Sequence, residues 1–339
     1  MNNSNFKFVI YLHASTIFVL NLKTMKDRKF PWGSDKRYND YSVYFKKRFE
    51  GKVQKISLDA GFTCPNRDGS RGVGGCTYCN NKSFSPEYCR LEKNITDQLL
   101  SGIGFFSAKY PTMRYLAYFQ AYSNTYAPVE ILRQSYEEAL RHPDVIGLVI
   151  ATRPDCLSEE VLDLLEDFSK RCYVSIELGV ESFKEETLQR INRGHTVQDS
   201  IAAIHRIARR GIDNCIHLIL GLPGETDADF ISYAETLSGL PVQSIKLHQL
   251  QIHKETRMAM EYRKNPAGFN LFEMEQYADL AVRFLEHLSQ DIIVQRFVSS
   301  APATLVIAPN WGLKNNEFVA KVEKLLEIRD SWQGRNMRI

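Results

Sequence analysis

The stretch ISLDAGFTCPNRDGSRGVGGCTYCNNKSFSPEYC, residues 56–89, decides how the rest of this 339-residue chain is interpreted. It contains Cys64, Cys76 and Cys79 in a C-x11-C-x2-C arrangement, shortly after an apolar run, residues 53–58, that predicts a strand. A C-x2-C pair places two sulfurs on one tight turn, where a third thiolate from the preceding loop can join them. The spacing indicates a metal or cluster site held by thiolates.

Two kinds of centre fit this spacing, and the number of ligands distinguishes them. Structural zinc requires four protein ligands, and Cys89 is then the fourth. An iron–sulfur cluster that binds a substrate requires only three, because one iron stays open. The Gly-rich linker RDGSRGVGG lets the backbone approach a bound ligand closely. On spacing alone both centres stay open, as does a simple buried role for the cysteines.

The segment Cys76-Thr77-Tyr78-Cys79 resembles the cluster loop of radical S-adenosylmethionine (SAM) enzymes. Their commonest spacing is C-x3-C-x2-C, and the longer first gap is similar to that of the catalytic subunit of Elongator and of related uncharacterised bacterial radical SAM proteins. Further motifs fit the same branch in the family's order: TRPDC at 152–156, ELGVES at 177–182, INRGHT at 191–196 and LILGLPGET at 218–226. Together they favour a cluster over zinc.

Beyond the cysteine loop, β-rich runs alternate with helical patterns, which predicts a parallel sheet with crossover helices. The expected strands cover residues 53–58, 115–120, 146–151, 173–178, 215–220, 244–249 and 292–297. The resemblance implies an α/β fold, a partial (βα)6 TIM-like barrel of the radical SAM type with a short α/β C-terminal extension. We divide the chain into a leader (1–50), a core barrel (51–245) and the extension (246–339).

Polar clusters follow the first four strands, and in barrels such loops meet at one cavity. The resemblance implies that Cys64, Cys76 and Cys79 hold a [4Fe-4S] cluster, whose open iron binds the amino and carboxylate groups of SAM. Tyr78 then lies near the adenine. After the second strand, relatives carry a Gly-Gly-Glu-like element that receives the SAM amino group. This chain has other residues there, so only backbone contacts carry over: Gln120, Ala121, Tyr122 and Ser123.

Two further positions are implied to bind the polar groups of SAM. Thr152 and Arg153 meet the carboxylate, since Arg suits a bidentate contact; the alternative for Arg153 is a salt bridge at the barrel rim. Glu177 and Glu181, four residues apart on an extended strand, point to the same side. One carboxylate is implied to accept hydrogen bonds from the ribose hydroxyls, while the other balances the positive charge of the sulfonium. The alternative is that at least one of them is a buried ion-pair partner for Arg193.

The motif LILGLPGET is implied to contact the adenine through Leu220, Gly221 and Leu222. Many relatives place a Glu three residues after that glycine, whereas this chain has Gly224 there, so Glu225 is assigned no role. In the extension, Lys254 and Arg296 are candidate substrate contacts, although a structural role is favoured for each.

The leader is strongly basic. From Lys23 to Lys55, eleven basic and four acidic residues give a net charge of +7, against +3 for the whole chain. Aromatic residues are interleaved with these charges: Phe30, Trp32, Tyr38, Tyr41, Tyr44, Phe45 and Phe49. Basic side chains can neutralise RNA phosphates and aromatic rings can stack on unpaired bases, so this combination is compatible with RNA binding. The alternative, which we favour, is a helix over residues 41–49 whose aromatic face packs on the core.

Composition limits the class of protein. The length and 44% hydrophobic content suffice for one large domain with appendages. Seven unevenly spaced cysteines do not resemble a secreted disulfide framework, so we expect a reducing cytoplasm. Residues 6–22 are mostly apolar but too short and interrupted to span a membrane. We interpret residues 1–24 as preceding a true start at Met25 rather than as a signal peptide.

The resemblance also implies the chemistry, which belongs to the cofactor. A reduced cluster passes one electron to SAM, and the resulting 5′-deoxyadenosyl radical abstracts a hydrogen atom from the substrate. An electron donor such as flavodoxin or ferredoxin is then a partner. Elongator relatives act on wobble uridines of transfer RNA (tRNA), so a tRNA nucleoside is one hypothesis for the substrate. A small metabolite or protein side chain is the second, and a zinc-held nucleic-acid-binding module is the third.

Overall fold

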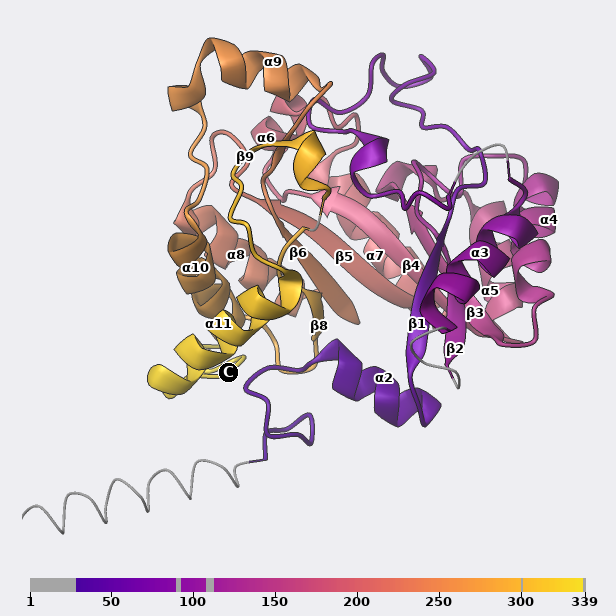
Figure 1. The fold of residues 1–339 in the computed structure, drawn as a ribbon, viewed down its shortest axis with the longest axis horizontal. Helices are drawn as coiled ribbons and strands as arrows, with labels where there is room; N and C mark the ends of the chain where they lie inside the picture. Colours follow the sequence, from indigo (N-terminus) through magenta and orange to yellow (C-terminus); the bar gives the residue numbers. More distant parts are fainter. Residues whose placement is uncertain (1–28, 90–92, 108–112, 300, 338–339) are drawn as a thin grey trace, which may run out of the picture.

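The computed structural model describes residues 29–89, 93–107, 113–299 and 301–337. Its centre is a sheet of seven parallel strands in the order β1-β2-β3-β4-β5-β6-β8, curled into a half-barrel (Figure 1). The strands are β1 (Val53–Leu58), β2 (Arg114–Phe119), β3 (Val145–Thr152), β4 (Tyr173–Glu181), β5 (Asp213–Leu220), β6 (Ser244–Gln249) and β8 (Ile293–Arg296). The predicted partial α/β barrel is confirmed.

The crossover helices form the outer layer of the half-barrel (Figure 1). They are α3 (Ile95–Ser107), α4 (Val129–Leu140), α5 (Glu159–Ser169), α6 (Glu185–Arg190), α7 (Val197–Arg209), α8 (Asp227–Ser238) and α10 (Met274–Glu286). Helices cover the outer face of the sheet and side chains fill its inner side, so a strand is buried on both faces. Its sequence is therefore a continuous run of apolar residues. Strand β3, VIGLVIAT, is the example, since seven of its eight residues are buried.

Two features of the sheet differ from the expectation. The resemblance implies six strands, whereas seven are present: β8, which pairs in parallel with β6, is the strand expected over residues 292–297. Strand β4 continues to Glu181, three residues beyond its predicted end, and its register with β5 shifts between Gly179 and Glu181. Glu181 takes the left-handed conformation, with φ of 71°. Bulges of this kind re-aim side chains near functional sites.

Helix α2 (Tyr41–Phe49) lies across the lower end of the half-barrel in Figure 1 and contacts both edge strands, β1 and β8. Phe45 is 5% exposed, and its ring packs against Tyr41, Phe49 and Tyr173. The aromatic face of this helix therefore packs on the core, as the favoured interpretation of the leader predicts. The buried Phe45 ring is not available to stack on RNA bases.

The C-terminal region packs on the leader. Helix α11 (Asn315–Ile328) follows a small antiparallel ribbon of β7 (Ile252–His253) and β9 (Val306–Ala308), and α9 (Arg257–Lys264) lies between the two ribbon strands in sequence. Lys36 forms an ion pair with Glu323 at 2.6 Å, and Arg37 forms one with Asp330 at 3.0 Å. Two of the leader's positive charges are thus paired with carboxylates of the C-terminal region. The division of the chain at residues 50 and 245 stays a prediction.

The interpretation of residues 1–24 concerns a segment outside the described residues. Within the described residues, no helix is long and apolar enough to cross a membrane.

Candidate active site

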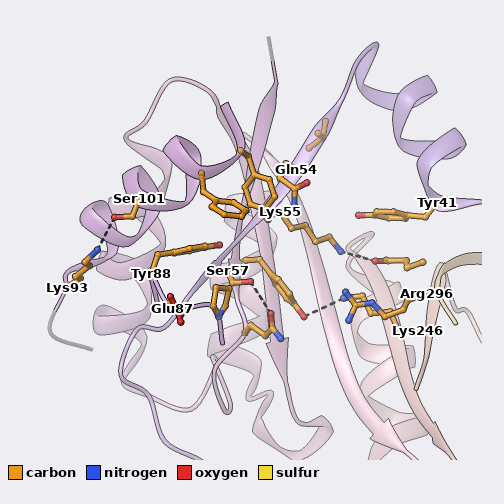
Figure 2. A pocket seen from close by; sticks show the side chains of 17 residues that line it. Tyr41, Gln54, Lys55, Ser57, Glu87, Tyr88, Lys93, Ser101, Lys246 and Arg296 are labelled. Atoms are coloured by element: carbon orange, nitrogen blue, oxygen red, sulfur yellow. Dashed lines mark hydrogen bonds between the residues drawn. The ribbon is translucent and has the colours of Figure 1, made fainter. Parts of the chain in front are cut away.

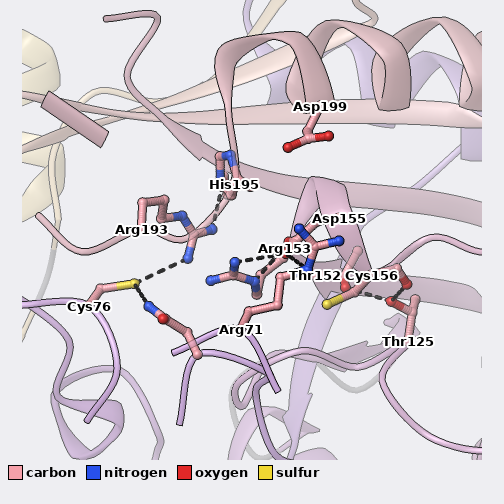
Figure 3. Close-up of polar contacts among 12 residues, drawn as sticks. Arg71, Cys76, Thr125, Thr152, Arg153, Asp155, Cys156, Arg193, His195 and Asp199 are labelled. Atoms are coloured by element: carbon pink, nitrogen blue, oxygen red, sulfur yellow. Dashed lines mark hydrogen bonds and ion pairs between the residues drawn. The ribbon is translucent and has the colours of Figure 1, made fainter. Parts of the chain in front are cut away.

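Loops at the carboxyl ends of the strands meet around one cavity, which we call the cysteine cavity. Predicted site residues from four consecutive strands and their loops line it: Cys64, Cys76, Tyr78 and Cys79 after β1, Gln120, Tyr122 and Ser123 after β2, Thr152 and Arg153 at β3, and Glu177 and Glu181 on β4. The predicted convergence is therefore present. Figure 3 shows part of its wall, with Cys76 beside Arg193 and with Arg153 beside Asp155.

The thiols in this cavity are largely shielded from water. Cys64 and Cys76 are 8% and 7% exposed, and Cys79 is half-buried. The Cys76 sulfur accepts hydrogen bonds from Asn66 Nδ2 at 3.5 Å and Arg193 Nη1 at 3.4 Å. Burial, reinforced by Cys76, raises the pKa of the Cys79 thiol to about 12. A bound metal would supply the positive charge that thiolates need at such a site.

The spacing of the sulfurs argues against a single zinc ion. In the described chain, only Glu177, Cys215 and His217 bring three potential ligand atoms within 4.8 Å of one another. The three predicted ligand cysteines are therefore spread more widely than the ~3.8 Å that tetrahedral zinc with ~2.3 Å bonds requires. Cys89 does not line the cavity, and its thiol donates to the Ser57 carbonyl at 2.7 Å. The fourth ligand of the zinc hypothesis is therefore absent from this site.

The cavity wall carries buried polar atoms without a partner among the described residues. They include Arg153 Nη1, Arg193 Nε, His248 Nε2 and His253 Nδ1. Buried polar groups in folded proteins are normally hydrogen-bonded, so unpaired ones beside three thiols indicate a polar ligand. This donor set fits a thiolate-held cluster together with SAM, which offers amino, carboxylate and hydroxyl groups.

Arg153 is both a salt-bridge residue and a cavity residue. Its Nε and Nη2 atoms donate to the two carboxylate oxygens of Asp155, each at 2.9 Å, which is the rim salt bridge considered from the sequence. The remaining Nη1 has no partner among the described residues. The neighbouring Thr152 hydroxyl lies 2.6 Å from the Thr125 hydroxyl. One edge of the Arg153 guanidinium is therefore still available to a carboxylate.

Glu177 lies at the centre of a buried ion-pair network. Its two oxygens accept from Lys55 Nζ at 2.7 Å, Lys246 Nζ at 2.6 Å and the Tyr118 hydroxyl at 2.6 Å, and one lies 3.0 Å from His217 Nε2. Burial opposes ionisation, but Lys246 and Lys55 hold the pKa of Glu177 well below its usual range. Because this carboxylate is already committed to two cations, its closeness to His217 does not make a metal site.

Glu181 and Arg193 meet beneath the cluster loop. Arg193 Nη2 donates to the Gly179 carbonyl and lies 3.6 Å from Glu181 Oε1, so the alternative of an ion pair with Arg193 is present. A Cβ atom at Gly179 would lie 2.6 Å from Arg193 Nη2 and from Glu181 Oε1, so both side-chain ends would have to shift to accommodate it. The same guanidinium donates to the Cys76 sulfur through Nη1.

Four predicted cofactor contacts are not brought to the cavity wall. Ala121, Leu220 and Leu222 are buried, and none of them lines the cavity. A Cβ on Gly221 would contact the Phe272 ring at 3.2 Å. In their place Ile219 and Leu250 line the cavity. The adenine contact of the LILGLPGET motif stays a prediction.

The sequence comparisons decide the family. A family model for the radical SAM superfamily matches residues 64–237, and one for a radical SAM C-terminal domain matches residues 242–327. The chain belongs to the radical SAM superfamily. Members of this superfamily use a [4Fe-4S] cluster and SAM, and this chain is a radical SAM enzyme.

Its relatives place it in the branch that its motifs resemble. This radical SAM protein is 36% identical over 316 residues to the uncharacterized protein YtqA of Bacillus subtilis, which covers 92% of this chain and 96% of that protein. It is 25% identical over 198 residues to the tRNA uridine(34) acetyltransferase of Methanocaldococcus infernus, covering 57% of this chain and 35% of that protein. The structure of Elp3 from the same archaeon, with an N-terminal deletion, has a similar fold, with a TM-score of 0.64 at 17% identity over 84% of this chain and 64% of that one.

Sequence reasoning missed several residues of this radical SAM site. Asn66 and Arg193 contact the Cys76 sulfur, yet neither was assigned a role at the cluster. His248 lines the cavity, and its Nε2 atom has no hydrogen-bond partner in the described part of the chain. The INRGHT motif was the available signal for Arg193, because a buried arginine far along the chain needs a specific anionic or polar partner.

Proposed function

We propose that this radical SAM enzyme holds its [4Fe-4S] cluster on Cys64, Cys76 and Cys79 and cleaves SAM reductively in the cysteine cavity. The observation that supports this most strongly is the convergence of three shielded thiols with unpaired polar atoms on one wall. When both are bound, the cluster supplies an electron and SAM supplies a 5′-deoxyadenosyl radical for hydrogen abstraction.

The chain's own residues have simpler tasks. Asn66 and Arg193 would orient Cys76 and offset thiolate charge by donating to its sulfur. The open edge of Arg153 would bind the SAM carboxylate together with Thr152, while Tyr78, Tyr122, Ser123 and Glu181 line the space for the rest of SAM. Neither a catalytic acid nor a base is assigned, because the chemistry belongs to the cofactor.

We further propose that the substrate is a tRNA nucleoside and that the enzyme works in the cytoplasm with flavodoxin or ferredoxin as electron donor. The similarity to a tRNA uridine(34) acetyltransferase supports the substrate class. The seven unevenly spaced cysteines do not resemble a secreted disulfide framework, which supports a reducing compartment. Radical SAM enzymes need a reductant, which supports a small redox partner.

Cluster content after anaerobic reconstitution tests the assignment of the ligands. We expect about four irons and four sulfides per chain in the wild type, a near-complete loss in Cys76→Ala, and no loss in the matched control Cys89→Ala. Equal loss in both variants would favour a four-cysteine site and overturn the assignment.

Nucleoside analysis tests the substrate class. tRNA from a strain that lacks the gene, digested and analysed by mass spectrometry, should lack one modified nucleoside that a plasmid copy restores. A copy with Cys64, Cys76 and Cys79 replaced by Ala should not restore it. Identical nucleosides in all strains would instead favour a small metabolite or a protein side chain.

A further inference from the structure

A second cavity of about 880 Å³ opens between the two edge strands of the half-barrel, and we call it the lateral cavity (Figure 2). Four side chains line both this cavity and the cysteine cavity: Tyr118, Gln120, Lys246 and Arg296. A molecule in the lateral cavity therefore reaches the edge of the cysteine cavity. The volume is in the range of ~300–1,000 Å³ that small organic ligands occupy in proteins.

One wall of the lateral cavity is cationic. Lys55 from β1, Lys246 from β6 and Arg296 from β8 project into it (Figure 2). Glu177 neutralises one of the two lysine charges, so this wall keeps a net positive charge. Lys55 Nζ donates to Glu177 and to Gln295 Oε1 at 2.8 Å, so one of its three N–H groups has no acceptor among the described residues.

Arg296 is the least committed cation in this wall. It is exposed, and no described residue forms a hydrogen bond or an ion pair with its guanidinium. A guanidinium offers five donors in a planar fork that matches phosphate or carboxylate oxygens. An unpaired arginine between two adjoining cavities is therefore suited to an anionic group of the substrate.

The other wall is aromatic. Tyr88 precedes α3, and Phe105 and Phe106 lie near the end of that helix. Phe105 is 72% exposed, whereas Phe106 is half-buried. Lys93 and Glu87, of opposite charge, are the remaining charged residues on this side. Flat rings facing a cationic wall match a molecule with a planar base and an anionic group.

We propose that the lateral cavity binds a nucleoside phosphate unit of the substrate, with its phosphate on Arg296 and Lys55 and its base against Tyr88 and Phe106. This inference rests on the proposed function, because hydrogen abstraction requires the substrate to reach the cysteine cavity. The same unit occurs in a free nucleotide and in one residue of an RNA chain, so both sources present the chemistry that this site recognises.

Calorimetric binding to the reconstituted full chain tests the site. The probes are the four ribonucleoside 5′-monophosphates, the matching nucleosides, inorganic phosphate and a short single-stranded RNA. We expect at least one monophosphate to bind more tightly than its nucleoside, and Arg296→Gln to weaken the monophosphate about tenfold to a hundredfold, as expected for a lost charged hydrogen bond. Tyr88→Ala should weaken monophosphate and nucleoside alike.

The control is Lys46→Gln, which removes one exposed positive charge from α2, outside both cavities, and should leave every affinity unchanged. RNA binding at least about tenfold more tightly than the monophosphate would identify RNA as the source, and equal affinities would identify a free nucleotide. Either result supports the proposal that the lateral cavity binds a nucleoside phosphate unit. Failure of every monophosphate to bind, or equal affinity of Arg296→Gln and wild type, would overturn it.

The two proposals fail separately. A wild-type protein that forms 5′-deoxyadenosine but binds no nucleotide would refute the lateral cavity assignment alone. A protein that binds nucleotides but never cleaves SAM would refute the proposed function.

Discussion

At the residue scale, Glu177 joins side chains from four other strands: Lys55, Tyr118, His217 and Lys246. It has no exposed surface, so its charge is compensated entirely by these neighbours. Removing one partner of a buried ion pair is costly because the other charge is left without compensation.

We therefore expect Glu177→Gln to lower the free energy of unfolding by ~3–5 kcal/mol, measured by urea denaturation. The control Glu159→Gln, which removes a carboxylate from an exposed ion-pair cluster with Arg206 and Arg210, should change the free energy of unfolding little.

Because the pKa of Glu177 is lowered on folding, the contribution of its charge to stability is present above the unfolded pKa of ~4.3. That contribution is lost as the pH falls below this value. Unchanged stability of Glu177→Gln would show that the network is dispensable.

Lys246 gives the lateral cavity a pH dependence. Burial, partly offset by Glu177, lowers the pKa of Lys246 to about 8. The other groups that face it are Lys55 on β1, Tyr118 on β2, Cys215 and His217 on β5 and Arg296 on β8. Burial raises the pKa of Cys215 to about 12 and that of Tyr118 well above its usual range, and it lowers that of His217.

Lys246 is thus the group expected to lose its charge between pH 7 and pH 9. We expect affinity for a nucleoside monophosphate to fall over this interval, because the cationic wall loses one charge. Lys246→Arg, which keeps its charge, should abolish the decrease. Calorimetry in matched buffers measures both, and an equally steep decrease in Lys246→Arg would contradict this role.

The cysteines could be predicted at the residue scale because their spacing is local in sequence. Their supporting contacts could not, because Arg193 and Cys76 are 117 positions apart in the sequence and meet only in the folded chain. Asn66 lies within the cluster loop, but which atoms it contacts depends on the fold of that loop.

At the element scale, the packing of helix α2 determines the role of the basic leader. Its aromatic residues pack on the core, while Lys46, Lys47 and Arg48 stay exposed. The helix also contacts both edge strands of the half-barrel, β1 and β8, so it stabilises their arrangement relative to each other.

We expect Phe45→Ala to lower the free energy of unfolding by ~3–5 kcal/mol, as for other buried aromatic residues. The neighbouring Lys46→Ala should stay within ~0.5 kcal/mol of the wild type. Thermal and urea unfolding measure both variants. Wild-type stability of Phe45→Ala, combined with weaker tRNA binding, would instead restore the interpretation of the leader as a base-stacking surface.

The long strands and helices could be predicted from the sequence, whereas the short ones could not. Buried parallel strands such as β3 form continuous apolar runs, and long helices such as α10 show a clear period. The ribbon of β7 and β9 has two and three residues per strand, too few to show alternation. The bulge in β4 depends on side chains around Gly179 that meet only in the fold.

At the scale of the whole molecule, the half-barrel places two cavities side by side. The cysteine cavity lies at the carboxyl ends of the strands, and the lateral cavity lies between the edge strands, with Tyr118, Gln120, Lys246 and Arg296 shared. The fold class followed from strand–helix alternation and the family motifs. The lateral cavity could not be foreseen, because it is formed by residues from α2, β1, α3 and β8 that have no common sequence pattern.

The central claim is that the three cysteines support reductive cleavage of SAM. Its most direct test is to incubate the anaerobically reconstituted protein with dithionite and SAM and to measure 5′-deoxyadenosine by chromatography. We predict that the wild type forms 5′-deoxyadenosine and that the variant with Cys64, Cys76 and Cys79 replaced by Ala does not. A colourless protein that carries stoichiometric zinc and forms no 5′-deoxyadenosine would contradict the account.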